Sequence, residues 1–338
     1  MTIDRTLAIS LRERPTGELE PTFFDLVEQQ VPELSPGEIL IRTGDLSLDP
    51  YLRATLVGKH IGDRAVPIGG VIPGRSVGQV IRSRDERFAE GVLVLAETGW
   101  RELAVVPGSA ATPVSVPEGV ASSAVLSTLG MPGLTAYASV VRHLTPRVGD
   151  TVAISSATGG VGAVAGQLAK LSGARTVAIV GHPRKARIAT EELGYDASVV
   201  RTADDWTTAL VEACPQGIDA YLHMGDAATL DVAMEQLATG ARVSLVGIRD
   251  AYGSGSATKV RAGAVMSARA TVSGMVVFDH ADIADEQVAR LGSLLREGKM
   301  VLHEDRYQGL AKAPEAFIGL LAGENHGKVI VEVSPRDD

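Results

Sequence analysis

Two hydrophobic patterns follow one another along this chain of 338 residues. Up to about residue 120, short runs of Val, Ile and Leu are separated by Gly and Pro, which is typical of a compact β-rich domain. From about residue 124, apolar runs alternate with helix-compatible segments, which predicts a parallel sheet with helices on both faces. Within this second part we expect strands at 151–154, 175–180, 197–200, 218–222, 242–247 and 271–277, and helices at 184–193, 204–213, 227–238 and 284–297.

A glycine-rich stretch joins the first two strands of the alternating part. Residues 155–166 read Ser-Ser-Ala-Thr-Gly-Gly-Val-Gly-Ala-Val-Ala-Gly, directly after the apolar run 151–154. Glycine lets a backbone approach a ligand closely, and the N–H groups and dipole of a helix start hold an anion. The order strand, glycine turn, helix, strand therefore predicts a dinucleotide site, whose diphosphate lies against Gly159, Gly160, Val161 and Gly162.

The residues after the second strand indicate which dinucleotide is bound. About 20 residues past the first glycines, a site for NAD(H) usually places an Asp or Glu against the ribose 2′-OH. Here residues 180–187 read Val-Gly-His-Pro-Arg-Lys-Ala-Arg and contain no carboxylate. The cations that follow Gly181, among them Lys185, match the charge of a 2′-phosphate, which an Asp would repel. The segment predicts NADP(H) rather than NAD(H).

Composition and charge argue against several other classes of protein. The formal net charge is −9, which is unfavourable for a general affinity for nucleic acid or anionic membranes. A single cysteine, Cys214, excludes an internal disulfide and fits a reducing compartment. No apolar stretch approaches the roughly 18 residues of a membrane span, and the first residues lack a signal-peptide pattern, so we expect a cytoplasmic protein.

Three phrases along the chain are specific enough to indicate a protein family. They are Leu-Ser-Leu-Asp-Pro-Tyr-Leu-Arg at 46–53, Leu-Gly-Met-Pro-Gly-Leu-Thr-Ala-Tyr at 129–137 and Gly-Glu-Asn-His-Gly-Lys at 323–328. With them the chain resembles the medium-chain dehydrogenase/reductase superfamily, and more narrowly its zinc-independent branch of leukotriene B4 12-hydroxydehydrogenase/prostaglandin reductase, curcumin reductase and alkenal double-bond reductases. The resemblance implies a GroES-like substrate and catalytic domain at 1–123, completed by 304–338, a Rossmann NADP-binding domain at 124–303, and a homodimer.

The resemblance also implies roles for individual residues. The family places a lysine and often a tyrosine near the 2′-phosphate, and this chain has Lys185 and Arg201 at those positions. Met131 and Thr135 lie in the segment that borders the nicotinamide, and Asn325 matches an asparagine at the same end. Two tyrosines complete the implied site: Tyr252 flanks the cofactor after the fifth strand, and Tyr51 lies close to the substrate pocket.

The chain departs from the family pattern at a few positions. Relatives commonly carry an aspartate, a valine and paired glycines after the fourth strand, where this chain reads Tyr-Leu-His-Met-Gly-Asp at 221–226. Ser267 stands where some relatives place a tyrosine over the substrate. Zinc-dependent relatives have Gly-His-Glu where this chain has Gly74-Arg75-Ser76, and one cysteine cannot form a structural zinc lobe. We therefore expect no metal site.

The expected reaction is conjugate reduction by NADPH. Without zinc, alcohol oxidation lacks its Lewis acid, which favours hydride addition to the β-carbon of an α,β-unsaturated ketone or aldehyde. Negative charge then builds on the carbonyl oxygen, and the enolate needs a hydrogen-bond donor and a proton source. Tyr51 and Tyr252 are the candidate catalytic donors, because a neutral phenol can donate to that oxygen.

Two other functions stay open from the sequence. NADPH:quinone reduction is the activity of zinc-free cousins, and only the phrase at 46–51 favours the enone branch over it. A non-catalytic NADPH-binding sensor is the second alternative, because a fold does not determine a function and the positions of His223 and Ser267 differ from the family pattern.

Overall fold

The computed structural model describes residues 4–57, 65–247 and 258–334, which form two compact units. Unit 1 comprises Met1–Leu126, Glu304–Asn325 and Val329–Asp338, and unit 2 comprises Ser127–His303 and His326–Lys328. The chain therefore starts in unit 1, builds nearly all of unit 2, and returns to unit 1 near its end. No helix of the described residues is long and apolar enough to cross a membrane.

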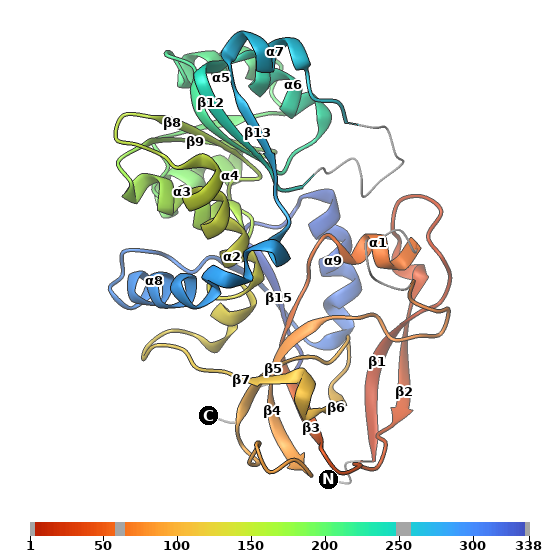
Figure 1. Ribbon diagram of the computed structural model, residues 1–338. Helices are drawn as coiled ribbons and strands as arrows, with labels where there is room; N and C mark the ends of the chain where they lie inside the picture. Colours follow the sequence, from red (N-terminus) through yellow and green to blue (C-terminus); the bar gives the residue numbers. More distant parts are fainter. Residues whose placement is uncertain (1–3, 58–64, 248–257, 335–338) are drawn as a thin grey trace. The chain divides into compact units, whose positions relative to one another are not determined.

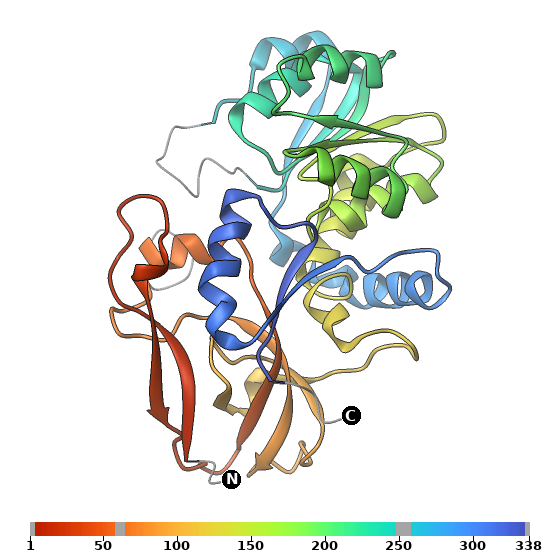
Figure 2. The same cartoon turned by 180° about the vertical axis from the view of Figure 1, so that it is seen from behind.

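Unit 1 consists mainly of antiparallel strands. In the described residues, one sheet has the order β14-β15-β3-β4-β5-β7, with β6 also paired to β3. Strands β1 and β2 form a separate two-stranded sheet, the red pair of strands in Figure 2. Its strands are β1 Arg5–Leu11, β2 Phe24–Gln30, β3 Glu38–Ser47, β4 Arg75–Ser83, β5 Leu93–Glu97, β6 Leu103–Pro107, β7 Ala111–Pro113, β14 Glu304–Gln308 and β15 Lys328–Glu332. Its helical segments are η1 Pro21–Phe23, α1 Leu52–Val57, η2 Gly108–Ala110, η3 Ser122–Leu126, η8 Leu310–Lys312 and α9 Ala313–Ala322.

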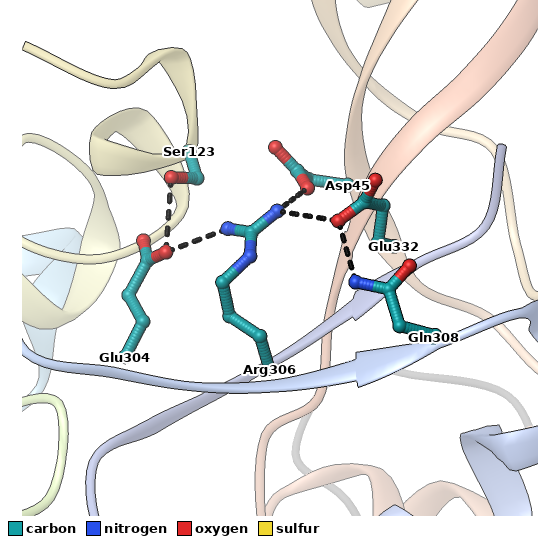
Figure 3. A network of polar contacts seen from close by, with 6 residues as sticks. All are labelled: Asp45, Ser123, Glu304, Arg306, Gln308 and Glu332. Carbon is teal, nitrogen blue, oxygen red and sulfur yellow. Dashed lines mark hydrogen bonds and ion pairs between the residues drawn. The ribbon is translucent and has the colours of Figure 1, made fainter. Parts of the chain in front are cut away.

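The C-terminal strands complete the sheet of unit 1. Ile330 of β15 pairs with Ser47 of β3, and α9 contributes Phe317 to a core cluster around the fully buried Trp100. A network of charged and polar side chains around Arg306 of β14 stabilises the C-terminal strands in this sheet (Figure 3). Its guanidinium contacts the fully buried Asp45 of β3 at 2.5 Å, and the other members are Ser123, Glu304, Gln308 and Glu332.

Unit 2 is built on a parallel sheet. In the described residues the sheet has the order β10-β9-β8-β11-β12-β13; α5, α6 and α7 cover one face, and α3 and α4 cover the other (Figure 1). Its strands are β8 Thr151–Ser155, β9 Arg175–Val180, β10 Ala197–Val200, β11 Ile218–His223, β12 Leu237–Leu245 and β13 Thr271–Gly274. Its helical segments are α2 Met131–Ala138, η4 Ser139–Leu144, α3 Gly162–Leu171, α4 Pro183–Arg187, η5 Ile188–Glu192, α5 Trp206–Ala213, α6 Ala227–Glu235, α7 Ala262–Ala268, η7 Val277–Ile283 and α8 Ala284–Arg296.

The buried central strands explain why this part of the sequence reads as continuous apolar runs. Every residue of β8 is buried, and β9 is buried after Arg175, because helices cover both faces of a parallel sheet. The alternating burial of β2 is the opposite case, a strand with one face toward solvent. The predicted α/β class with a parallel sheet in the second part of the chain is confirmed.

Some boundaries differ from those expected. The helix expected at 227–238 ends at Glu235, because Leu237 already pairs with Ile218 of β11 and begins β12. The strand expected at 271–277 ends at Gly274, and the chain then turns into η7. The helix expected at 184–193 is α4 followed by the wider turns of η5.

Candidate cofactor site

A tight turn follows β8 and starts α3; we call residues 156–162 the glycine turn. Ser156 has φ of +52°, in the left-handed region that non-glycine residues rarely adopt. Its carbonyl accepts a hydrogen bond from the N–H of Gly159 at 3.0 Å, and the carbonyl of Gly159 accepts from Ala163 at 2.9 Å. The chain thus reverses within a few residues and enters α3 at Gly162, which directs the helix start toward the crevice of the sheet.

The need for glycine differs sharply among the three glycines of this turn. A Cβ on Gly162 would lie 2.5 Å from the carbonyl oxygen of Ser156, which no side chain can accept without moving the backbone. A Cβ on Gly160 would meet the flexible Lys328 side chain at 3.1 Å, and one on Gly159 would have only an ordinary contact at 3.4 Å. Gly162 is therefore required by the turn itself, whereas a Cβ at Gly159 or Gly160 would require at most small shifts of its neighbours.

The buried side chain of Tyr195 supports the glycine turn. The Tyr195 hydroxyl donates to the carbonyl of Gly162 at 2.8 Å and lies 3.3 Å from that of Ala157. Its ring fills the space beside Gly166, where an added Cβ would lie only 2.1 Å from the ring. Burial raises the pKa of Tyr195 far above its usual value, so the phenol stays a neutral donor.

Hydrogen bonds tie the glycine turn to the end of β11. The hydroxyl of Ser155 accepts from the N–H of Met224 at 2.7 Å, and that of Ser156 donates to the carbonyl of Met224 at 3.2 Å. Strands β8 and β11 are neighbours at the point where the strand order reverses. In open parallel sheets, ligands bind in the crevice at this switch point, outside the carboxyl ends of the strands.

The start of α2 lies against the same turn. A Cβ on Gly160 would lie 3.4 Å from Pro132, the residue after Met131, and 3.1 Å from the buried Lys328. The hydroxyl of Thr135 donates to the carbonyl of Met131 at 2.8 Å, which orients the first turn of the helix. The structure therefore brings the Met131 segment, predicted to border the nicotinamide, together with the glycine turn.

The segment after β9, residues 181–187, includes α4 and carries the predicted 2′-phosphate contacts; we call it the basic loop. His182 accepts a hydrogen bond from the N–H of Arg184 at 3.1 Å and caps α4, whose first turn contains Lys185. Arg201, the residue after β10, donates its N–H to Val180 at 2.8 Å, and its guanidinium lies beside Gly181. Lys185, in α4, and Arg201, directly after β10, thus follow neighbouring strands at the carboxyl edge of the sheet.

A carboxylate joins this group of cations. Nη1 of Arg201 lies 2.6 Å from Oδ2 of Asp226, the residue that caps α6. Asp226 also accepts from the N–H and the hydroxyl of Thr229, at 2.9 and 2.7 Å. The charge pattern of residues 180–187 did not predict an acidic partner, because Asp226 is far away in sequence.

Two further predicted residues belong to the other unit, and a third lies outside the described part of the chain. Tyr51 and Asn325 belong to unit 1, where the Tyr51 ring packs against the core cluster around Trp100 and Asn325 is buried. Tyr252 lies outside the described residues. Among the residues that the structure describes, no group of three or more His, Cys, Asp or Glu could hold a metal ion. Independence from metal stays a prediction.

Sequence reasoning missed four residues of this site. They are Ser155, Tyr195, Asp226 and Lys328, each of which contacts the turn, Met224 or Arg201. No local motif marks Tyr195 or Asp226. The only usable signal was Gly166 in the middle of α3, since a glycine inside a helix indicates a close neighbour.

The fold and the glycine turn together define a dinucleotide-binding protein of the Rossmann type. Residues 8–114 match a protein family described as "N-terminal domain of oxidoreductase", and residues 160–292 match one described as "Zinc-binding dehydrogenase". These two matches begin and end within unit 1 and unit 2, respectively.

Full-length relatives narrow the class. The chain is 35% identical to "NADPH-dependent curcumin reductase" of Escherichia coli (strain K12), covering 97% of this chain and 96% of the relative. It is 32% identical to "Prostaglandin reductase 1" of Mus musculus, covering 91% and 93%. The crystal structure of CurA in complex with NADPH from Vibrio vulnificus superposes with a TM-score of 0.91 at 33% identity, covering 98% of this chain and all of that one.

The chain belongs to the medium-chain dehydrogenase/reductase family, in the branch of curcumin and prostaglandin reductases. The predicted resemblance is thereby confirmed, and so is the fold class of a GroES-like unit combined with a Rossmann unit.

Proposed function

We propose that this protein is an oxidoreductase that uses NADPH to reduce the C=C bond of an α,β-unsaturated ketone or aldehyde. The observation that carries the proposal is the glycine turn beside a basic loop, in a chain that aligns along 97% of its length with an NADPH-dependent curcumin reductase. Curcumin is itself a conjugated enone, so reduction of an activated C=C bond is the chemistry that this relative and the chain share.

The cofactor fits the residues present. The start of α3 and the glycine turn suit the diphosphate, because the free N–H groups and the dipole of a helix start hold an anion. Lys185 and Arg201 suit the 2′-phosphate, because permanent or strongly basic cations match its charge. When bound, NADPH supplies the hydride for the β-carbon of the substrate.

The other site assignments extend this proposal. Unit 2 is the NADP-binding domain, in which Met131 and Thr135 border the nicotinamide, and unit 1 is the substrate domain, which contributes Tyr51 and Asn325. Tyr51 and Tyr252 donate hydrogen bonds to the carbonyl oxygen as it gains negative charge, an interaction that stabilises the enolate. The half-buried position of Tyr51 at the start of α1 suits such a donor.

We also propose a cytoplasmic homodimer. The described part of the sheet in unit 2 ends at β13, whose unpaired edge is a template for a second copy. Val276 and Phe278 follow this strand and are 53% and 73% exposed, which supports an apolar contact there. Light scattering of the purified protein and of a Phe278→Glu variant tests the dimer.

The lone Cys214 bears on the cytoplasmic location. Its side chain is buried, which raises its pKa to about 11 and suits a protein that relies on no disulfide.

Absorbance loss of NADPH tests the activity. The purified protein is mixed with NADPH and an enone, an alkenal, a quinone or no acceptor, before and after treatment with a chelator. We expect rapid oxidation with the enone and the alkenal, and unchanged rates after chelation. Faster turnover of the quinone would replace the proposed reaction, and binding of NADPH without turnover would indicate a sensor. Loss of activity on chelation, restored by zinc, would overturn the metal-free chemistry.

A further inference from the structure

The ion pair of Arg201 and Asp226 crosses the part of the sheet where the cofactor site begins. Arg201 follows β10 and Asp226 follows β11, and β9 and β8 lie between these two strands in the sheet. Neighbouring strands are about 4.8 Å apart, so the two loops start roughly 14 Å apart. The 2.6 Å contact therefore links the segments after β10 and β11 across the carboxyl ends of β9 and β8.

The two ends of the Arg201 guanidinium have different surroundings. Nη1 is bound to Asp226, whereas Nε and Nη2 face Gly181, at 3.8 Å from the position of an added Cβ on that glycine. The Nε–Nη2 edge of a guanidinium carries two parallel N–H groups and is suited to bidentate binding of a phosphate. The carboxylate thus occupies one corner of the guanidinium, and the phosphate-binding edge is turned toward the loop that carries Lys185.

Asp226 is itself held in place. Its Oδ1 accepts from the N–H and hydroxyl of Thr229 at the start of α6, so its other oxygen is presented to Arg201 in one direction. Both side chains of the ion pair are mostly buried, with 25% and 20% of their area exposed. A long arginine side chain loses conformational freedom on binding a ligand, and a fixed partner removes much of that cost beforehand.

We propose that Asp226 is a positioning residue for selectivity toward ligands with a 2′-phosphate, because it orients Arg201 for that group. This inference rests on the proposed use of NADPH. The inference predicts a change in affinity opposite to the one expected from charge alone. By Coulomb's law, removing a negative charge close to a bound phosphate should strengthen binding. If Asp226 acts by orienting Arg201, removing that charge weakens binding instead.

Calorimetric titration with two probes tests the inference without turnover. Adenosine 2′,5′-bisphosphate carries the phosphate in question, and 5′-AMP lacks it. The variant Asp226→Asn removes the charge and keeps a residue that caps helices well, so α6 should remain intact. We expect the affinity of this variant for the bisphosphate to fall about tenfold, while the affinity for 5′-AMP changes less than twofold.

A double-mutant cycle identifies Arg201 as the group through which Asp226 acts. Arg201→Met should lose bisphosphate affinity selectively, and adding Asp226→Asn to it should cause no further loss. Asp226→Ser, which also caps a helix, serves as a second variant if the first one does not fold. A merely structural role would weaken both probes equally and would persist in the Arg201→Met background.

The outcomes separate this inference from the proposed function. If the wild-type protein binds the two probes equally well, the proposed cofactor is wrong. If the wild type prefers the bisphosphate and Asp226→Asn keeps or increases that preference, the cofactor stands and the positioning role of Asp226 is wrong.

Discussion

The two halves of the candidate cofactor site are built in different ways. The glycine turn is set by steric fit, since Gly162 and Gly166 leave no space for a Cβ, and the Tyr195 ring lies against Gly166 while its hydroxyl donates to the Gly162 carbonyl. The basic loop and Arg201 form the other half, which depends on charged side chains and one ion pair. The backbone contacts of the turn recognise what all dinucleotides share, whereas exchangeable side chains distinguish between them.

Gly162→Ala should have the largest effect, because its Cβ would lie 2.5 Å from the carbonyl oxygen of Ser156. We expect the free energy of unfolding to fall by roughly 3 kcal/mol and NADPH binding to be lost. Urea unfolding and calorimetry measure both. Gly159→Ala is the matched control, since its Cβ has only a 3.4 Å contact within the protein. Equal destabilisation by the two variants would refute the steric account of the turn.

Lys185→Glu should affect only the charged half of the site. We expect the Kd for NADPH to rise about 30- to 100-fold and the Kd for NADH to change much less, because the new carboxylate repels the 2′-phosphate. Lys299→Glu changes the net charge equally at an exposed position of unit 2 and should leave both affinities unchanged. Similar losses for NADPH and NADH in Lys185→Glu would show that Lys185 does not read the phosphate.

Tyr195→Phe should have a moderate effect on the steric half. The variant keeps the ring beside Gly166 and removes the donor to the Gly162 carbonyl, which costs about 1 to 2 kcal/mol of unfolding free energy. The midpoint of urea unfolding measures this loss. Because the ring still supports the turn, NADPH affinity should fall less than in Gly162→Ala. An unchanged midpoint would mean that the hydroxyl does not brace the turn.

The smallest effect should come from Asp196, the residue after Tyr195. Burial alone would raise the pKa of its carboxyl, but hydrogen bonds from Lys170 and Thr176 outweigh it and hold the pKa below its usual value. Its contribution to stability is therefore complete above the unfolded-state pKa of about 3.9 and is lost as pH falls through the lower folded-state pKa. Thermal midpoints measured from neutral to acidic pH should fall less steeply for Asp196→Asn than for wild type. If the thermal midpoints of wild type and Asp196→Asn fall in parallel as the pH is lowered, the predicted contribution of Asp196 is wrong.

The parts of the structure that sequence predicted are those encoded locally. Strands such as 151–154 and the glycine turn have their signal within about a dozen neighbouring residues, and their positions were predicted closely. The relation between Tyr195 and Gly166, or between Arg201 and Asp226, depends on which strands become neighbours in the sheet. The periodicity of apolar residues contains no such information, so these contacts are visible only in the structure.

The helix end at Glu235 shows the same limit on a smaller scale. The apolar pattern continues through Leu237 and Ala238, which suggested a longer helix. Pairing of Leu237 with Ile218 assigns these residues to β12, because a place in the ladder of a buried parallel sheet outweighs a weak local preference for helix.

The pairing of β3 with β15 determines when the protein can finish folding. All of β8 to β13 is synthesised without interruption and can assemble as soon as it leaves the ribosome. The amino-terminal sheet, although its first strands are made earliest, lacks a central neighbour of β3 until Ile330 has been added. Arg306 can then reach Asp45, and the earliest-made unit becomes the last to be completed.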